Sequence, residues 1–597
     1  MKLLDSLARE YTYIKCVGRT FYRLRHVKPH STHTIVDIVE EHAARTPASI
    51  AIFYQDRTVS YRALDEGANR IARWAMAQGI KRGDVVVLLM ENCPEYLMSW
   101  LGLFKLGAVA ALINTNLKGA PLGHSIAIAG ARHAIVGADL AEAYGEAAAG
   151  VEQKPTAWVT GGPAPAGTCD LDAALAGVSA APLDPAVRDG LTCKDNAFYI
   201  YTSGTTGLPK AANFSHQRML FMMHGFAGAM NTGPRDRTYC TLPLYHATGG
   251  ICSVGMALTV GGALIIRRKF SVSEFWEDCR SFRATFFQYI GELCRYLNNA
   301  LPDPRDGEHC LRGITGNGLR PEIWESFQKR FAIPRIVEFY GATEGNVAML
   351  NYDGTIGAVG RVPRYMRSIF STRVVRFDIA QETPVRGTDG YCIECEAGEP
   401  GEAVGKITSE PGHGFEGYTR AADTKKKILA DTFEKGDAWF RTGDLMRRDE
   451  NNYFYFVDRI GDTYRWKGEN VATSQVAEAL SVVSGIKEVN VYGVTVPGAE
   501  GRAGMAALVA EPQFDPAMLA EKIGANLPSY ARPAFLRLRP EMEITGTFKL
   551  KKADLVKDGF DPGRIDDPLY WYDHASARYA PLTQEVFAGI AAGRVKI

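Results

Sequence analysis

The segment from Tyr199 to Lys210 has the composition of a phosphate-binding loop. It reads Tyr-Ile-Tyr-Thr-Ser-Gly-Thr-Thr-Gly-Leu-Pro-Lys, so glycines, hydroxyl residues and a lysine follow an aromatic strand end. Glycines let backbone N–H groups approach phosphate oxygens, and hydroxyls and a lysine add donors and charge. Because the spacing is not that of a Walker A motif, an ordinary P-loop ATPase is disfavoured. The residues expected to contact phosphate are Thr202, Ser203, Gly204, Thr205, Thr206, Gly207 and Lys210.

Two later motifs end in carboxylates. Residues 339–345 read Phe-Tyr-Gly-Ala-Thr-Glu-Gly and directly follow an apolar strand. Ligands of α/β folds bind at the carboxyl ends of strands, so Tyr340 could stack on a base and Glu344 could hold Mg²⁺. Residues 439–444 read Trp-Phe-Arg-Thr-Gly-Asp. The final acid, Asp444, could accept hydrogen bonds from two ribose hydroxyls.

In this order the three motifs resemble those of the ANL superfamily of adenylate-forming enzymes. The resemblance runs from about Thr34 to the end of the chain and includes Asp458-Arg459 and the segment Thr545 to Lys549. Within the superfamily, the chain is most similar to the branch of fatty acid transport proteins and very-long-chain acyl-CoA synthetases. The segments that carry this closer similarity are 287–296, 316–321, 337–346, 464–470 and 501–505, together with the tail from 567 to 586.

The resemblance implies roles for the residues in these motifs. The loop from Thr202 to Lys210 would hold the β- and γ-phosphates of ATP, and Glu344 would hold the Mg²⁺ that neutralises charge on the leaving pyrophosphate. Lys549 matches a mobile lysine that meets the α-phosphate and the substrate carboxylate. The implied ATP or AMP ligands beyond the loop are Tyr340, Gly341, Thr343, Asp444 and Arg459, and the implied catalytic residues are Thr343, Glu344 and Lys549.

The resemblance also implies an acyl-binding site and a hinge. His246, in a Pro-Leu-Tyr-His segment, would border the acyl group, although a lone histidine could equally be a core residue. The aromatic residues at 286–289 could line an acyl tunnel or belong to the core. The hinge lies near Asp458-Arg459, and either Gly461 or Asp462 could be its pivot. The residues assigned to acyl binding are His246, Phe287, Tyr289, Gly316 and Asn317.

The N-terminal residues predict a basic amphipathic helix. Leu3, Leu7, Tyr11, Ile14, Val17, Phe21 and Leu24 are spaced by threes and fours, and the first 28 residues hold seven Lys or Arg and two acids. Such a helix could lie on an anionic membrane surface, or its apolar stripe could pack on its own domain. The apolar run 97–113 has Lys105 at its centre and is too short to span a bilayer, which favours a buried helix running toward a strand.

The composition is that of an intracellular globular protein. The 597 residues are 46% hydrophobic and carry a formal net charge of +1. The chain therefore has no overall positive electrostatic field that would attract nucleic acid. Eleven scattered cysteines indicate reduced thiols, and the lone Cys392–Cys395 pair is interpreted as strand residues rather than a metal site. No secretory signal is evident, so we expect a cytoplasmic protein that could associate with the inner face of a membrane.

Alternating helical and apolar patterns predict an α/β protein. We expect a basic amphipathic segment at 1–30 and a large ATP- and acyl-binding domain of βα subdomains at 31–458, with a small β-rich subdomain at about 354–458. A hinge at 459–462 then leads to a smaller, mobile α+β domain at 463–597 that carries Lys549.

The predicted activity is that of a long-chain fatty acid–CoA ligase. ATP and the fatty acid give acyl-adenylate and pyrophosphate with Mg²⁺, and CoA then displaces AMP to form the thioester. Two alternatives stay open: a fatty acid uptake or binding protein in which catalysis is secondary, and an adenylating enzyme that loads a carrier protein. The sequence sets neither the acyl chain length nor the oligomeric state.

Overall fold

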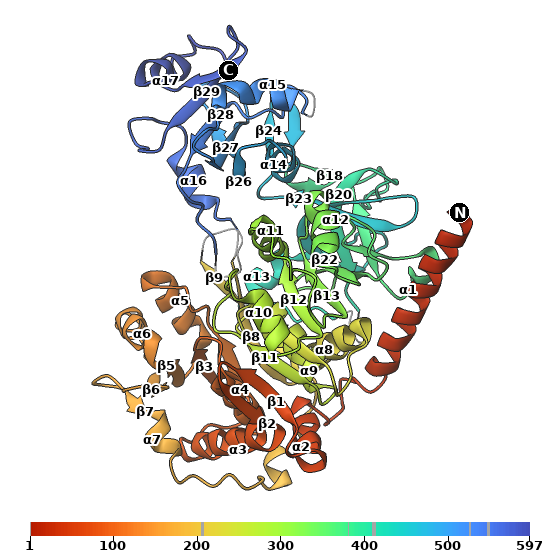
Figure 1. Cartoon of the computed structure of the whole chain (residues 1–597), viewed down its shortest axis with the longest axis vertical. Coiled ribbons are helices and arrows are strands. Elements are labelled where there is room, and N and C mark those ends of the chain that lie inside the picture. Colours follow the sequence, from red (N-terminus) through yellow and green to blue (C-terminus); the bar gives the residue numbers. More distant parts are fainter. Residues whose placement is uncertain (1, 204–207, 380, 409–413, 525–526, 546–549) are drawn as a thin grey trace. The chain divides into compact units, whose positions relative to one another are not determined.

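The strands of the first part of the chain form two sheets whose faces are covered by helices (Figure 1). The computed structural model describes residues 2–203, 208–379, 381–408, 414–524, 527–545 and 550–597. The chain divides into two compact units, one made of residues 1–361 and 406–428 and the other of residues 362–405 and 429–597. Each is described by itself, and the α/β class expected from the sequence is confirmed.

The seven-stranded sheet of the first unit is mostly parallel. Its central strands are runs of Val, Ile, Leu and Ala that are buried, as parallel strands covered on both faces must be. Its order is β7 (Cys169–Asp170), β6 (Thr156–Thr160), β5 (His133–Gly137), β3 (Val85–Leu89), β4 (Val109–Leu112), β8 (Asn196–Ser203) and β9 (Pro209–Ser215). The surrounding helices are α2 (Ile35–Arg45), α3 (Tyr61–Ala77), α4 (Pro94–Phe104), α5 (Gly119–Ala129) and α6 (Ala141–Ala148).

The eight-stranded sheet of the first unit separates two apolar clusters. Its order is β15 (Ala348–Asn351), β14 (Ile336–Gly341), β13 (Gly313–Asn317), β12 (Phe286–Ile290), β10 (Arg237–Cys240), β11 (Ala263–Ile266), β1 (Ile50–Tyr54) and β2 (Arg57–Ser60). One cluster includes residues of α10 (Phe275–Ser281), α11 (Gly291–Asn299) and α12 (Pro321–Arg330). The other includes residues of α8 (His216–Met230), the π-helix η3 (Ala247–Ser253) and α9 (Val254–Leu258).

The apolar run 97–113 is the end of α4 followed by β4, as expected for a buried helix that runs toward a strand. Lys105, directly after the helix, is 2% exposed and pairs with Asp65 at 2.8 Å and with Glu40. These carboxylates compensate a charge that would be costly to bury alone. No helix of the described residues is long and apolar enough to cross a membrane.

Helix α1 (Lys2–Leu24) is the predicted N-terminal helix, and one of its faces packs on the first unit. Tyr13, Cys16, Val17, Thr20 and Leu24 are buried. A Cβ atom at Gly228 of α8 would lie 2.7 Å from the Cα of Thr20, so a glycine is needed where the two helices meet. Arg19 donates hydrogen bonds to the carbonyls of Gly228 and Ala229, in the last turn of α8.

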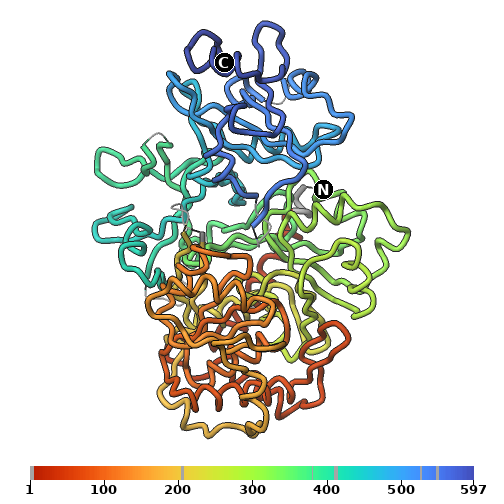
Figure 2. The backbone as a smooth tube through the Cα atoms, turned by 90° about the vertical axis from the view of Figure 1, so that its left-hand side faces the viewer, coloured from red at the N-terminus to blue at the C-terminus, as the bar shows by residue number. Residues whose placement is uncertain are grey.

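The second unit contains two larger sheets and two two-stranded ones. Strands β17 (Thr372–Val375), β20 (Pro400–Lys406), β22 (Ala438–Arg448) and β23 (Tyr453–Arg459) are neighbours in one sheet. The other has the order β26 (Ile486–Thr495), β27 (Arg502–Ala510), β28 (Phe535–Leu538), β29 (Leu569–Asp573) and β30 (Arg578–Pro581). Its helices are α14 (Thr473–Ser481), α15 (Leu519–Gly524), α16 (Ala553–Asp558) and α17 (Gln584–Ala591). The path of this last part, drawn in blue, can be followed in Figure 2.

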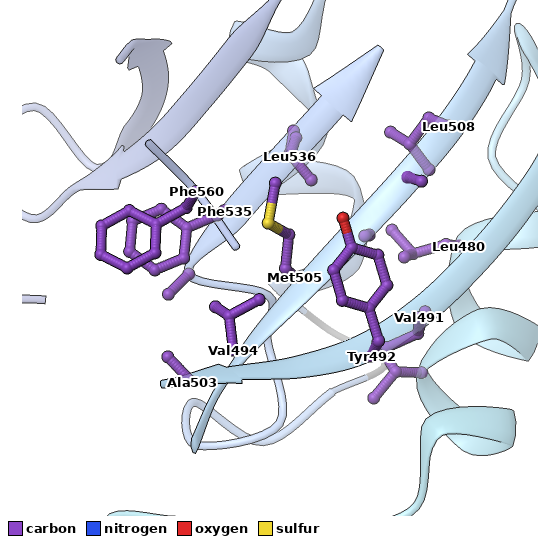
Figure 3. Packing of buried hydrophobic residues seen from close by; sticks show 14 of the residues in the cluster. Leu480, Val491, Tyr492, Val494, Ala503, Met505, Leu508, Phe535, Leu536 and Phe560 are labelled. Atoms are coloured by element: carbon purple, nitrogen blue, oxygen red, sulfur yellow. The ribbon is translucent and has the colours of Figure 1, made fainter. Parts of the chain in front are cut away.

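The five-stranded sheet has its own hydrophobic core. Phe560 stacks on Phe535 with ring centroids 4.2 Å apart, and Met505, Leu536 and Val494 lie beside them (Figure 3). These side chains come from strands far apart in the sequence and from the segment after α16. Because the cluster is contiguous and largely excluded from solvent, it provides the apolar burial that a separate domain needs.

His216, the first residue of α8, generates a prediction about acid stability. It is fully buried, both of its ring nitrogens lack a hydrogen-bond partner among the described residues, and its ring lies 4.7 Å from that of Phe104. Burial lowers the pKa of His216 from 6.5 to about 4. The unfolded chain therefore binds the proton more readily, and stability present above pH 6.5 is lost as the pH falls toward 4, by about 3 kcal/mol.

A His216→Leu variant should not have this loss. Denaturant unfolding of both proteins between pH 4 and pH 7 measures the difference. The exposed residue His30 offers a control, because His30→Asn should change stability with pH as the parent does. Parallel curves for the parent and His216→Leu would show that the buried imidazole does not determine the acid sensitivity.

Candidate functional site

The predicted phosphate loop connects β8 to β9, which pair as antiparallel neighbours at one edge of the seven-stranded sheet. Thr202 lies opposite Lys210 in this pairing. Residues 204–207 and the side chain of Ser203 lie outside the described part of the structure, so the contacts expected of Ser203, Gly204, Thr205, Thr206 and Gly207 stay predictions. The ammonium of Lys210 lies 2.8 Å from Asp423.

The second motif forms the end of β14 and the turn that follows. Tyr340 and Gly341 end the strand, and Thr343 and Glu344 lie in the turn. Arg218, in the first turn of α8, holds this turn by its backbone. It donates hydrogen bonds to the carbonyls of Glu344 at 3.1 Å and Ala342 at 3.0 Å, and also to that of Gly345. The pKa of Arg218 is lowered, chiefly by burial, while the charges of Glu416 and Glu344 oppose the shift.

The carboxylate of Glu344 lies beside the first motif. Its Oε1 accepts a hydrogen bond of 2.9 Å from the hydroxyl of Tyr418, which is also hydrogen-bonded to the side chain of Thr202. Lys427 Nζ lies 3.6 Å from the same Oε1. The structure therefore brings Thr202, Lys210 and Glu344 into one polar cluster, through contacts with the segment 416–427.

Sequence reasoning did not identify this segment. It contains α13 (Ala421–Lys426) and was placed within the β-rich subdomain at about 354–458, whereas the structure assigns residues 406–428 to the first unit. The available signal was the unusual order of groups in Tyr418 to Lys427, in which an aromatic residue, an acid and three consecutive lysines occur within ten positions. Nothing in their spacing indicates which earlier residues they contact.

Asp444 and Arg459, the expected ribose ligands, are directly opposite each other on β22 and β23 of the second unit. The backbone before Asp444 is fixed by hydrogen bonds: the Asp444 amide donates to the Thr442 hydroxyl at 3.1 Å, and that hydroxyl donates to the Ala403 carbonyl at 2.7 Å. Both expected ligands are thus placed together by an antiparallel strand pair, and their role in binding ribose stays a prediction.

The residues expected to bind the acyl group have different surroundings. His246 directly precedes the π-helix η3, a type of helix that is frequent at functional sites. Phe287 and Tyr289 lie in the apolar cluster with α10–α12. The neighbouring Phe286 lies in the other cluster, with η3 and α8. Because successive strand residues point to opposite faces, an acyl chain on one face of β12 would meet only one of these two sets.

Gly316 and Asn317 end β13, and the loop that follows is held by a buried carboxylate. Glu338 accepts hydrogen bonds from the amide of Leu319 at 3.1 Å, from that of Gly318 and from the hydroxyl of Tyr289. Burial raises the pKa of Glu338 to about 8, and these three donors oppose the shift. A side chain at Gly316 would collide with Tyr289, its partner on β12, so a glycine is needed at this position of β13.

The predicted hinge residues, Gly461 and Asp462, belong to the second unit. Asp462 Oδ2 lies 3.1 Å from Lys552 Nζ, and Lys552 also donates a hydrogen bond of 2.7 Å to Thr473. Lys549 lies outside the described residues, so its catalytic role stays a prediction. The pivot at Gly461 or Asp462 and the domain boundary at 459–462 are likewise untested.

Two family models match most of the chain. Residues 39–408 match the family described as AMP-binding enzyme, and residues 475–549 match the AMP-binding enzyme C-terminal domain. The chain is 40% identical to mouse long-chain fatty acid transport protein 6, an alignment that covers 94% of this chain and 91% of the relative.

Solved structures share the fold. The anthranilate CoA ligase AuaEII in complex with anthranoyl-AMP superposes with a TM-score of 0.74 at 20% identity, over 88% of this chain and 96% of that one. A fatty acyl CoA synthetase of Mycobacterium tuberculosis superposes with a TM-score of 0.60 at 25% identity, over 88% of this chain and 98% of that one.

Arg218 yields a prediction for nucleotide binding. A lysine there keeps the charge, but its single ammonium does not reproduce the fork of guanidinium donors that reaches three carbonyls. Arg218→Lys should therefore weaken ATP binding at least tenfold, about 1.4 kcal/mol, as measured by calorimetry with Mg²⁺ present. Arg235→Lys, an exposed change in the same unit, should leave the affinity unaltered. Equal affinities of the Arg218→Lys variant and the parent would show that the turn does not need this support.

Proposed function

The chain belongs to the AMP-binding enzyme family, and from this premise we propose that it is an ATP-dependent acyl-CoA synthetase for long-chain fatty acids. The observation that carries the proposal is the polar cluster of Thr202, Lys210 and Glu344, which combines phosphate-binding groups with a carboxylate. The substrate class is supported by relatives named long-chain fatty acid transport proteins and by the mycobacterial fatty acyl CoA synthetase.

The first half-reaction joins the fatty acid to AMP. A carboxylate oxygen of the acid attacks the α-phosphorus of ATP, an O–P bond forms, and pyrophosphate leaves with the electron pair of the broken bond. The chain supplies no covalent nucleophile in this step. Lys210 and Thr202 hold the phosphates, Thr343 donates to the α-phosphate, and Lys549 stabilises the charge that develops between the reactants.

The oxygen donors at Glu344 fit Mg²⁺, which prefers carboxylate and hydroxyl oxygens and usually retains several waters. Glu344 and Thr202 would hold the ion, which supplies charge neutralisation for the departing pyrophosphate. In the second half-reaction the sulfur of the CoA thiol attacks the acyl carbonyl carbon and loses its proton to solvent. The C–S bond forms, the C–O bond to the phosphate breaks, and AMP leaves with the electron pair of that bond. Asp444 and Arg459 hold the ribose throughout, and movement at Gly461 or Asp462 exchanges the groups presented to the adenylate.

A screen of pyrophosphate release with carboxylic acids of increasing chain length, with and without CoA, tests this function. We expect the highest kcat/KM with long-chain acids and thioester only when CoA is present. In Lys549→Ala, adenylation should fall by several orders of magnitude, whereas thioester formation from supplied acyl-adenylate should be largely retained, because the ammonium acts on charge present only in the first transition state. Lys551→Ala is the neighbouring control. Release of pyrophosphate only with short or aromatic acids would refute the long-chain assignment.

We further propose that α1 attaches the protein to an anionic membrane surface without spanning the bilayer. While one face of this helix packs on the first unit, the opposite side exposes Leu7, Tyr11 and Ile14, which are 59%, 67% and 56% exposed and spaced as one helical stripe. Tyr22 continues the stripe, with Arg25 above its ring, and Lys15 lies above Tyr11. Exposed apolar and aromatic groups flanked by cations are typical of helices that lie in the membrane interface.

Replacing Leu7 and Ile14 together by glutamine should reduce sedimentation with phosphatidylserine-containing liposomes at least severalfold, because it removes apolar area from the interface. Activity on a soluble, shorter acid should stay nearly unchanged. Ser6→Gln, which adds the same side chain off the stripe, should sediment like the parent. Unaltered sedimentation of the double variant would overturn the assignment of this face to the membrane.

A further inference from the structure

We propose that Tyr418 is a positioning residue that holds the carboxylate of Glu344 in the orientation required to bind Mg²⁺ with ATP. This inference rests on the proposed function and deepens it. Residue 418 lies between the two family matches, which end at residue 408 and resume at residue 475, so neither of them assigns it a role. The argument comes from how the segment 416–427 is attached and from what its side chains contact.

The segment is fixed to β9, the strand that directly follows the phosphate loop. The Asn213 amide donates to the Gly417 carbonyl at 3.0 Å, and the Thr419 amide donates to the Ala211 carbonyl at 3.0 Å. These two bonds make residues 417–419 a short antiparallel addition to the edge of the sheet. At one end the carboxylate of Glu416 accepts a hydrogen bond of 2.7 Å from the amide of Ser215. Tyr418 is therefore carried by backbone that the sheet holds in place.

The conformation around Tyr418 is specific. Gly417 has φ of +69°, and a Cβ atom there would lie 2.6 Å from the side chain of Thr424. The hydroxyl of Thr424 accepts a hydrogen bond of 2.9 Å from the Tyr418 amide. The left-handed conformation of Gly417 and the hydrogen bond to Thr424 fix the backbone of Tyr418, whose hydroxyl reaches the turn after β14.

The Tyr418 hydroxyl links two residues of the site. It donates to Glu344 Oε1 at 2.9 Å, and the side chain of Thr202 also interacts with it. A tyrosine hydroxyl has an ordinary pKa of about 10, so it is protonated and neutral at pH 7. A neutral donor that engages one carboxylate oxygen orients the group and leaves its negative charge available to a cation.

The same segment also provides charges. Asp423 pairs with Lys210 at 2.8 Å, and Lys427 lies 3.6 Å from Glu344 Oε1. Lys210 Nζ lies above the Tyr418 ring, 5.8 Å from its centroid. Each charged side chain of the site thus has an opposite charge from the segment 416–427, and Tyr418 lies between the two pairs. Fixing the carboxylate before the ion arrives reduces the side-chain ordering that binding would otherwise require.

Tyr418→Phe tests the proposal, because it removes the hydroxyl and keeps the buried ring. In assays of pyrophosphate release at saturating ATP and acid, we expect the half-saturating Mg²⁺ concentration to rise about five- to tenfold, in line with the loss of a hydrogen bond to a charged group. The maximal rate at saturating Mg²⁺ should change less than twofold, and the rate of thioester formation from supplied acyl-adenylate should not change.

A matched control is Tyr455→Phe, which removes a tyrosine hydroxyl hydrogen-bonded to Asp449 in the second unit. It should leave the Mg²⁺ dependence unaltered. In a Glu344→Asp background, whose shorter carboxylate is displaced from the hydroxyl, Tyr418→Phe should have less than a twofold further effect. Such non-additivity is expected of a direct pair and not of a general loss of stability.

An unchanged half-saturating Mg²⁺ concentration in folded Tyr418→Phe would overturn the proposal, and so would an equal effect of this change in both Glu344 backgrounds. If no carboxylic acid supports pyrophosphate release, the proposed function fails, and calorimetric binding of ATP with and without Mg²⁺ then tests Tyr418 by itself. In that measurement Tyr418→Phe should bind ATP without Mg²⁺ as tightly as the parent does. The increase in ATP affinity that Mg²⁺ produces in the parent should be lost in the variant. The reverse pattern would contradict the proposal.

Discussion

The arrangement of the site depends on a buried guanidinium that replaces missing backbone hydrogen bonds. The turn at residues 342–345 leaves regular strand pairing, so its carbonyls need donors from elsewhere. Arg218 supplies them from the start of α8, and the burial of its charge is in turn acceptable only because carbonyl dipoles and carboxylates surround it. The carbonyls of the turn need donors and the buried guanidinium needs acceptors, and each supplies the other. The position of α8 therefore fixes the turn that carries Thr343 and Glu344.

The sequence was informative wherever chemistry is local. The glycine- and hydroxyl-rich loop, the strand end at Tyr340 and the acid at Asp444 are contiguous motifs, and the α/β class follows from the alternation of patterns. It was uninformative where contacts join distant segments. Tyr418 contacts Glu344, 74 positions away, and residue spacing holds no signal for such a contact. Similarly, the stripe on α1 did not show that Val17 would be buried while Ile14 is exposed, because the packed face is selected by α8.

Side-chain direction on a strand was another limit. Phe286 and Phe287 are adjacent and chemically alike, yet they belong to clusters on opposite faces of the same sheet. The two-residue repeat of a strand predicts that successive side chains point to opposite faces of the sheet. It does not predict which face meets a ligand, because that depends on the helices added later in the chain. The same applies to Glu338, whose role in holding the loop after β13 depends on the neighbouring strand β14, which the chain reaches through the crossover helix α12.

Helix α8 has a mechanical consequence beyond its packing. Its first turn carries Arg218, which holds the turn with Glu344, and its last turn carries Gly228, on which α1 rests. Ten residues of α-helix separate these points, about 15 Å of rigid rod. If α1 lies on a bilayer as proposed, α8 fixes the distance between the point where α1 is attached and the turn that carries Glu344. An acid that leaves the membrane then meets a reaction centre whose distance from the attached helix is fixed. The length of the acid therefore becomes part of substrate selection.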